Sequence, residues 1–105
     1  MAEQPSMMEM LRQARDLQKK MKKIQKQVEK TEITAAAGDG LVTVVVSGKL
    51  HVRSVTIDPS LLSRGDVRLI QELVTSAVNA ALEKAQEIMT EEMKKVTGGL
   101  DLPDM

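Results

Sequence analysis

The chain of 105 residues has no cysteine, tryptophan, tyrosine or phenylalanine, and its single histidine is His51. Without cysteine the protein forms no disulfide and offers no thiolate for catalysis or for zinc. One histidine excludes a paired-histidine metal site and argues against a Ser-His-Asp triad. Without aromatic rings the protein lacks the stacking platforms on which many proteins hold single-stranded nucleic acid. These absences indicate a function that depends on surface shape and charge.

Long hydrophobic runs are also missing. No apolar stretch reaches the roughly 20 residues of a membrane span, and the first six residues lack the charged start and apolar stretch of a signal peptide. We therefore expect a cytoplasmic protein without a membrane partner. A core without rings, in a chain of this size, buries little apolar area, and an obligate homodimer would relieve that limit.

The net charge of zero is an average over two unlike parts of the chain. The 15 basic and 15 acidic residues cancel overall, but residues 7–30 hold eight basic residues against three acidic ones, a net charge of +5. Residues 31–105 have a net charge of −4, and Glu3 contributes the remaining −1. The charge is therefore segregated by segment.

The basic segment predicts one long helix over residues 7–30. Ser6 is the expected N-cap, and Glu9 follows at the spacing of a capping box. Apolar residues recur at alternating intervals of three and four, an uninterrupted heptad pattern that we call the apolar seam. The apolar seam consists of Met7, Met10, Ala14, Leu17, Met21, Ile24 and Val28.

The following residues predict three short strands joined by tight turns, which indicates an antiparallel sheet. The expected strands are Glu32–Ala37, Leu41–Ser47 and Leu50–Ile57. Apolar residues change parity within the third strand, so we predict a bulge near Arg53 and Ser54. That bulge would put Leu50, Val52, Val55 and Ile57 on one face and would point Lys49, His51 and Arg53 outward.

A second long helix is expected after the sheet. Asp58-Pro59 ends the third strand, and after residues 60–65 Asp66 can cap a helix that runs to about Thr97. The fold class is α+β, an α-β-β-β-α protomer with a long helix at each end and a three-stranded antiparallel sheet between them. We expect one domain over residues 1–105, with residues 1–6 and 98–105 as tails.

The predicted helix lengths bear on the assembly. At 1.5 Å per residue the two helices are roughly 36 and 46 Å long, whereas a compact domain of 100 residues has a radius of gyration near 13 Å. Both helices cannot lie within so small a globule. We expect parts of them to project as arms from a symmetric homodimer.

The basic residues of the first helix are the candidate DNA-binding site. Most fall at heptad positions b, c and f, farthest from the apolar seam, and a row of cations of this kind can neutralise a phosphate backbone. We call this set the basic ridge: Arg12, Arg15, Lys19, Lys20, Lys22, Lys23, Lys26 and Lys30. A lysine-rich helical face can also serve solvation alone, but such faces usually mix both signs of charge.

Other features offer weaker candidates. Lys49, His51 and Arg53 could make a second phosphate contact or an ordinary polar face. The Met-rich helix ends (Met7, Met8, Met10, Met89 and Met93) could bind a partner or simply pack. No glycine-rich phosphate loop, metal-ligand cluster or nucleophile with its base is evident. We expect no enzyme activity, no cofactor, no metal and no small-molecule substrate.

Several segments in order resemble the YbaB/EbfC family of bacterial nucleoid-associated proteins. They are Met10–Ala14, Gln18–Met21, Gly40–Val42, Gly48-Lys49, Val55–Leu62, Ala77–Ala81, Lys84-Ala85 and Thr97–Pro103. The resemblance implies an α-β-β-β-α protomer, a homodimer with helical arms, and binding of double-stranded DNA in the nucleoid, without a cofactor or enzymatic activity. The alternative is a protein-binding adaptor or chaperone-like scaffold without direct DNA contact, whose partner would stay bound after nuclease treatment.

Overall fold

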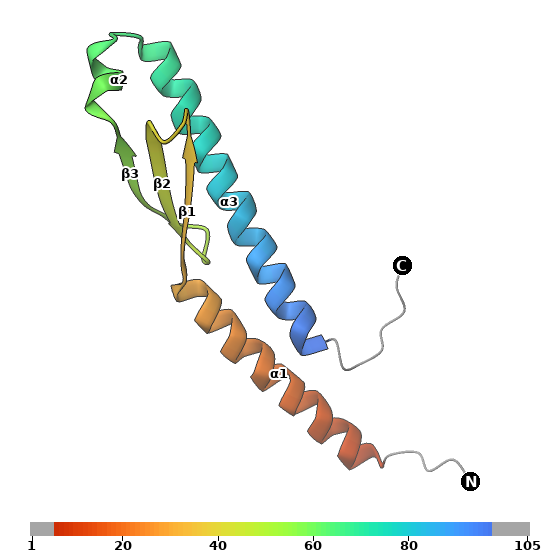
Figure 1. The fold of residues 1–105 in the computed structure, drawn as a ribbon. Helices are drawn as coiled ribbons and strands as arrows, with labels where there is room; N and C mark the ends of the chain where they lie inside the picture. Colours follow the sequence, from red (N-terminus) through yellow and green to blue (C-terminus); the bar gives the residue numbers. More distant parts are fainter. Residues whose placement is uncertain (1–5, 98–105) are drawn as a thin grey trace, which may run out of the picture.

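The structure, a computed structural model, describes residues 6–97, so both predicted tails lie outside the described residues apart from Ser6. The elements in chain order are α1 (Met7–Lys30), β1 (Glu32–Ala37), β2 (Val42–Ser47), β3 (Val52–Ile57), α2 (Pro59–Ser63) and α3 (Val67–Thr97) (Figure 1). The α+β class is confirmed, with one long helix before and one long helix after a three-stranded antiparallel sheet in the chain. The short helix α2 is an addition to the predicted order.

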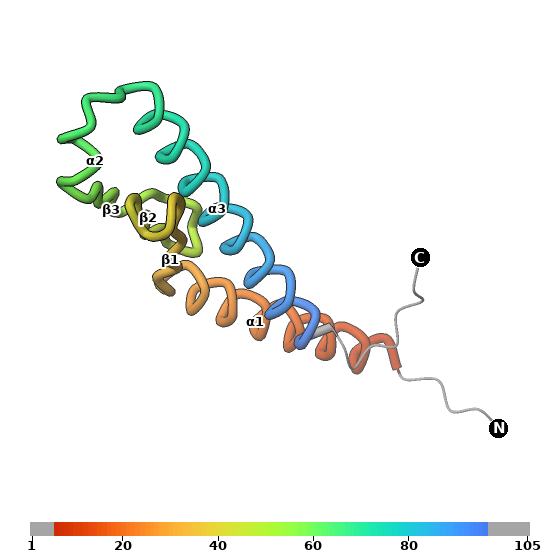
Figure 2. Tube along the Cα trace, turned by 45° about the horizontal axis from the view of Figure 1, so that its top comes forward, coloured from red at the N-terminus to blue at the C-terminus, as the bar shows by residue number. Residues whose placement is uncertain are grey.

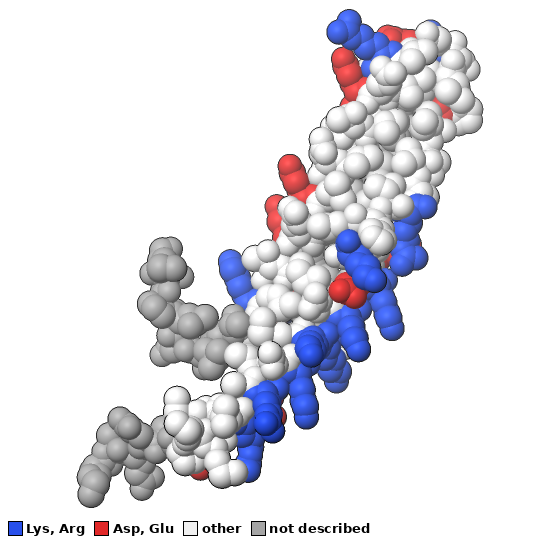
Figure 3. All heavy atoms as spheres, turned by 180° about the vertical axis from the view of Figure 1, so that it is seen from behind, with Lys and Arg blue, Asp and Glu red and all other residues white. Residues whose placement is uncertain are grey.

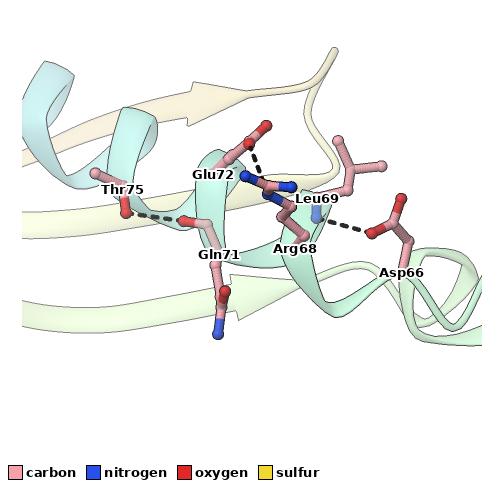
Figure 4. A network of polar contacts seen from close by, with 6 residues as sticks. All are labelled: Asp66, Arg68, Leu69, Gln71, Glu72 and Thr75. Atoms are coloured by element: carbon pink, nitrogen blue, oxygen red, sulfur yellow. Dashed lines mark hydrogen bonds and ion pairs between the residues drawn. The ribbon is translucent and has the colours of Figure 1, made fainter.

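Side-chain caps fix where the long helices begin. The Ser6 hydroxyl accepts a hydrogen bond from the Glu9 amide at 3.2 Å. Figure 4 shows the second cap, in which the Asp66 carboxylate accepts a hydrogen bond from the Leu69 amide at 3.1 Å. Each of these caps satisfies an amide that the first turn of a helix leaves without a backbone partner. Both predicted caps are confirmed.

The helix α2 was not predicted from the sequence. Pro59 occupies its first turn, and the Asp58 carboxylate accepts a hydrogen bond from the Ser60 amide at 2.9 Å. Hydrogen bonds from the side chain and the backbone of Ser60 lower the pKa of Asp58 below its ordinary value. Leu61 is fully buried, so this turn of helix is held by packing as well as by its cap.

The sheet has the order β1-β2-β3 with antiparallel neighbours. The register between β2 and β3 pairs Val45 with Ser54 and Val46 with Val52, so Arg53 is an extra residue. This confirms the predicted bulge. The predicted start of the third strand at Leu50 is wrong, because Leu50 has a φ of 66° and belongs to the β2–β3 turn.

The core lies between α3 and the first two strands (Figure 1). Three small residues spaced four apart on α3, Ala77, Ala81 and Ala85, are fully buried, as are the valines of β2 that face the helix. Residues at this spacing share one helix face, and their short side chains allow the helix to lie close to the sheet. The C-terminal half of α3 continues past the sheet and runs beside α1 (Figure 2).

The shape is elongated, with extents of 75 × 26 × 15 Å and a radius of gyration of 20.7 Å. This exceeds the value of about 13 Å for a compact domain of 100 residues. The expectation that parts of the two long helices project is therefore confirmed, since both extend well beyond the sheet (Figures 1 and 2).

The C-terminal end of α1 is fixed against the β2–β3 turn. The Gly48 amide donates a hydrogen bond to the Thr31 carbonyl at 3.0 Å, and Val28 is buried nearby. A Cβ atom at position 48 would lie 1.8 Å from the Val28 carbonyl oxygen. Only glycine permits this approach, so Gly48 sets how closely α1 meets the hairpin.

Replacing Gly48 with alanine should therefore destabilise the protein strongly. We expect Gly48→Ala to lower the free energy of unfolding by about 3 kcal/mol, because backbone must move to relieve the clash. Urea denaturation at a fixed chain concentration measures this. The matched control is Gly40→Ala, where a Cβ meets nothing but φ is 88°, at a cost of about 1 kcal/mol. Equal losses of unfolding free energy in the two variants would contradict the role of Gly48 in the close approach of α1 to the hairpin.

Candidate nucleic-acid interface

The basic ridge follows α1 along most of its length. All eight of its side chains are exposed. Figure 3, a view from behind, shows lysine and arginine side chains projecting in a row along the part of the molecule that contains α1. The long capped helix with its apolar seam turned toward α3 explains the row, because residues on the seam's far side must face solvent.

The positive charges of the basic ridge have no ion-pair partner among the described residues. Within residues 6–97, no ion pair joins a ridge residue to a carboxylate; ion pairs do form elsewhere, between Arg68 and Glu72 at 3.9 Å and between Lys95 and Glu92 at 3.0 Å. The ridge cations are therefore available to an external anion.

Two residues of the basic ridge lie at the border between α1 and α3. Lys20 and Lys23 line a hollow of about 440 Å³ between the helices, together with Ile24, Glu92 and Lys95. The structure thus brings all eight predicted residues onto one helix surface but places these two next to a carboxylate of α3.

The β2–β3 turn, which contains Lys49, lies beside the C-terminal part of α1. Lys49, His51 and Arg53 are exposed, as expected from the bulge. Lys49 lines a hollow of about 520 Å³ with Gln25 and Glu29 of α1, which shows that the turn lies beside the helix. Nothing in the local sequence pattern around Lys49 reveals that this residue lies beside α1.

Acidic side chains gather on another side of the molecule. Glu83, Glu87 and Glu91 follow each other at intervals of four on α3 and line one shallow hollow. Ala81 and Ala85, which lie two positions away from Glu83, are buried against the sheet, so the acidic residues face away from it. The protein therefore has a positive side along α1 and a negative side along α3.

The described residues show no constellation for metal chemistry or membrane insertion. In the stretch from residue 6 to 97, no three His, Cys, Asp or Glu side chains are arranged to hold a metal ion. In the same stretch no helix combines the length and apolar character needed to cross a bilayer.

Comparison with known proteins gives a family match over nearly the whole chain. The profile of the YbaB/EbfC DNA-binding family matches residues 3–100. A nucleoid-associated protein of Alkaliphilus metalliredigens is 43% identical over 101 residues, covering 96% of this chain and 89% of the relative. A nucleoid-associated protein of Clostridium acetobutylicum is 42% identical over 100 residues, covering 95% and 89%.

A solved structure shares the fold. The crystal structure of the uncharacterized protein HP0035 from Helicobacter pylori matches with a TM-score of 0.72 at 22% sequence identity. The match covers 84% of this chain and 92% of that protein. At this identity the likeness supports the fold alone.

Removing ridge charges should leave the fold intact, because these side chains have no partner within the described chain. We expect Lys22→Gln and Lys26→Gln to change the free energy of unfolding by less than about 0.5 kcal/mol each. Urea denaturation of each variant beside the parent protein measures this. A loss above about 1 kcal/mol would show that the ridge has a structural role.

Proposed function

The chain belongs to the YbaB/EbfC DNA-binding family, and we propose that it is a nucleoid-associated homodimer that holds double-stranded DNA mainly by its phosphate backbone. The observation that carries the proposal is the exposed, unneutralised ridge on α1. The names of its relatives support a place in the nucleoid.

The dimensions of the ridge suit duplex DNA. From Arg12 to Lys30 it spans 18 residue steps, or roughly 27 Å of helix, alongside which B-DNA presents about eight base pairs. Lysine and arginine heads can reach phosphate oxygens along that length without entering a groove. Phosphate contacts position a protein but do not read sequence, so we propose little direct base recognition.

A second copy would cover an apolar face at β3. Val52 and Val55 are 46% and 42% exposed, although they share a sheet face with the buried residues Val46 and Val44. Val52 and Val55 are exposed because α3 packs over β1 and β2 and leaves the edge strand β3 uncovered. Leu62 of α2, which follows β3, is also exposed. An uncovered apolar face beside an open sheet edge favours symmetric self-association.

A homodimer would carry two basic ridges, so the positive charge that it offers to DNA would be twice that of a single ridge. Two ridges can engage one duplex at separate places or connect two duplexes, which is how such a protein would organise the nucleoid and affect gene expression. The acidic side of α3 would repel phosphates and restrict DNA to the α1 side.

DNA binding should be steeply salt-dependent and should require the ridge. In a mobility-shift titration we expect log K to fall with log salt at a slope near −0.9 for each phosphate neutralised. Lys19→Glu together with Lys26→Glu should weaken binding at least about tenfold, because two attractions become repulsions. The matched control, Arg64→Glu together with Arg68→Glu, makes the same change in net charge away from the ridge.

The two double variants distinguish the ridge from general charge. Equal weakening would mean that net charge, and not α1, controls binding. A flat salt slope in the parent protein would remove phosphate contact from the mechanism.

The homodimer should depend on the uncovered face of β3. We expect Val55→Asp to convert a dimer into a monomer at low micromolar concentration, because a carboxylate buried without a partner costs several kcal/mol. Sedimentation equilibrium measures the mass. The control is Thr56→Asp, one residue along on the opposite sheet face, which pairs with Thr43. A dimer that survives Val55→Asp and dissociates with Thr56→Asp would place the interface on the other face.

A further inference from the structure

Two large apolar side chains lie on the basic side of α1 and not on its apolar seam. Met8 is 76% exposed and Leu11 is 56% exposed. Met8 shares heptad position b with Arg15 and Lys22, which follow it by seven and fourteen residues. Leu11 follows Met8 by three residues and is its neighbour on the helix surface. The row of cations on α1 therefore ends in an exposed apolar pair on the same side of the helix.

A hollow joins this apolar pair to the basic ridge. Its volume is about 330 Å³, and it is lined by Met8, Leu11, Arg12, Arg15, Asp16 and Lys19. Three cations and one carboxylate give these lining residues a net charge of +2 (3 − 1). A purely apolar partner would gain nothing from that charge, so the hollow suits a partner that offers anions beside an apolar surface.

The cations beside the apolar pair differ from those along the rest of the ridge. Arg12 and Arg15 are the two arginines of the basic ridge, and both are exposed. Arginine is more weakly hydrated than lysine and binds phosphate through two donors, which suits the strongly negative edges of a narrow minor groove. Methionine and leucine are among the side chains that minor-groove proteins insert between base steps. The first turns of α1 thus combine two residue types that proteins use in the minor groove.

The shape of duplex DNA places a groove under one end of a straight helix. B-DNA completes a turn in roughly 35 Å, so over the roughly 27 Å of the ridge the phosphates of one strand curve away around the duplex. Met8 lies about one helical turn beyond Arg12, past the last cation of the row. The N-terminal end of α1 also projects beyond the described end of α3 (Figure 1), so a duplex can approach it.

We propose that Met8 and Leu11 enter the minor groove of the duplex that the ridge holds, with Arg12 and Arg15 on the phosphates at its edges. This inference rests on the proposed DNA binding and adds a second kind of contact to it. The two apolar side chains contact sugars and base edges, where the exocyclic amino group of guanine projects into the groove of each G·C pair. The protein accordingly favours a minor groove without that amino group, whereas phosphate contacts alone give no such preference.

Duplexes in which inosine replaces every guanine test this contact. Inosine lacks the exocyclic amino group in the minor groove but keeps the hydrogen-bonding groups of guanine in the major groove. In mobility-shift titrations at one salt concentration, we expect the protein to bind the inosine duplex at least about threefold more tightly than the guanine duplex of the same sequence.

Shortening the two apolar side chains should remove the preference for inosine. We expect Met8→Ala to lower the ratio of the two affinities by at least about half, and Met8→Ala with Leu11→Ala to bring it to about one, because alanine cannot fill the groove. The salt slope stays that of the parent protein, since every ridge cation remains. The matched control is Met10→Ala, which removes an exposed methionine of the apolar seam two positions from Met8, on another face of the helix, and should keep the ratio.

The outcomes separate the groove contact from the phosphate contact. A ratio that falls with Met8→Ala and persists with Met10→Ala supports the proposal. Equal affinity of the parent protein for both duplexes, with a steep salt slope, would overturn it and leave the phosphate contacts of the ridge in place. A preference that survives the double substitution, or that Met10→Ala removes equally, would also overturn it.

Two further results would count against the groove contact. A fall in the mass of the Met8→Ala and Leu11→Ala double variant in sedimentation equilibrium without DNA would overturn it, by showing that a second copy covers these side chains. Failure of the parent protein to bind either duplex would overturn both this inference and the proposed function. The substituted side chains are exposed, so the fold does not depend on them.

Discussion

The close contact between the end of α1 and the β2–β3 turn determines the direction of the basic helix. Gly48 and Thr31 share a backbone hydrogen bond of 3.0 Å, and the Val28 carbonyl occupies the space that a side chain at position 48 would need. Because α1 leaves the sheet at this point, the contact sets the angle of the whole ridge. It also brings Lys49 of the hairpin beside Gln25 and Glu29 of α1.

The helix α3 joins two kinds of packing that the small sheet could not provide alone. Its first half lies on β1 and β2 through small, fully buried alanines, and its second half supports α1 through larger half-buried residues. The ridge consequently stands on a projecting pair of helices, well exposed to water. Exposed charges are screened within about 10 Å at 0.1 M salt, so in the proposed function the ridge would attract DNA by proximity and not by a long-range field.

Local patterns in the sequence predicted most of the fold and the candidate site. The heptad spacing gave the extent and exposed face of α1, the caps at Ser6 and Asp66 gave the helix starts, and the parity change gave the bulge at Arg53. The features that the sequence did not predict are those that depend on tertiary contacts. The position of Leu50 at positive φ follows from closure of the hairpin, and α2 is too short to show a periodicity. The adjacency of Lys49 to α1 depends on a contact between segments distant in sequence.

The two uncovered apolar surfaces lie at opposite ends of the molecule, which constrains how the chain can associate and still expose its ridge. The exposed residues of β3 and α2 are near the start of α3, whereas the exposed residues Met7, Met8, Met10 and Leu11 are at the N-terminal end of α1 (Figure 1). Pairing of two copies along the apolar seam would compete with α3 for Leu17, Met21 and Ile24. Pairing at β3 leaves α1 of each copy against its own α3, with the cations outward. The arrangement that covers the β3 valines is thus also the one that keeps both ridges open to DNA.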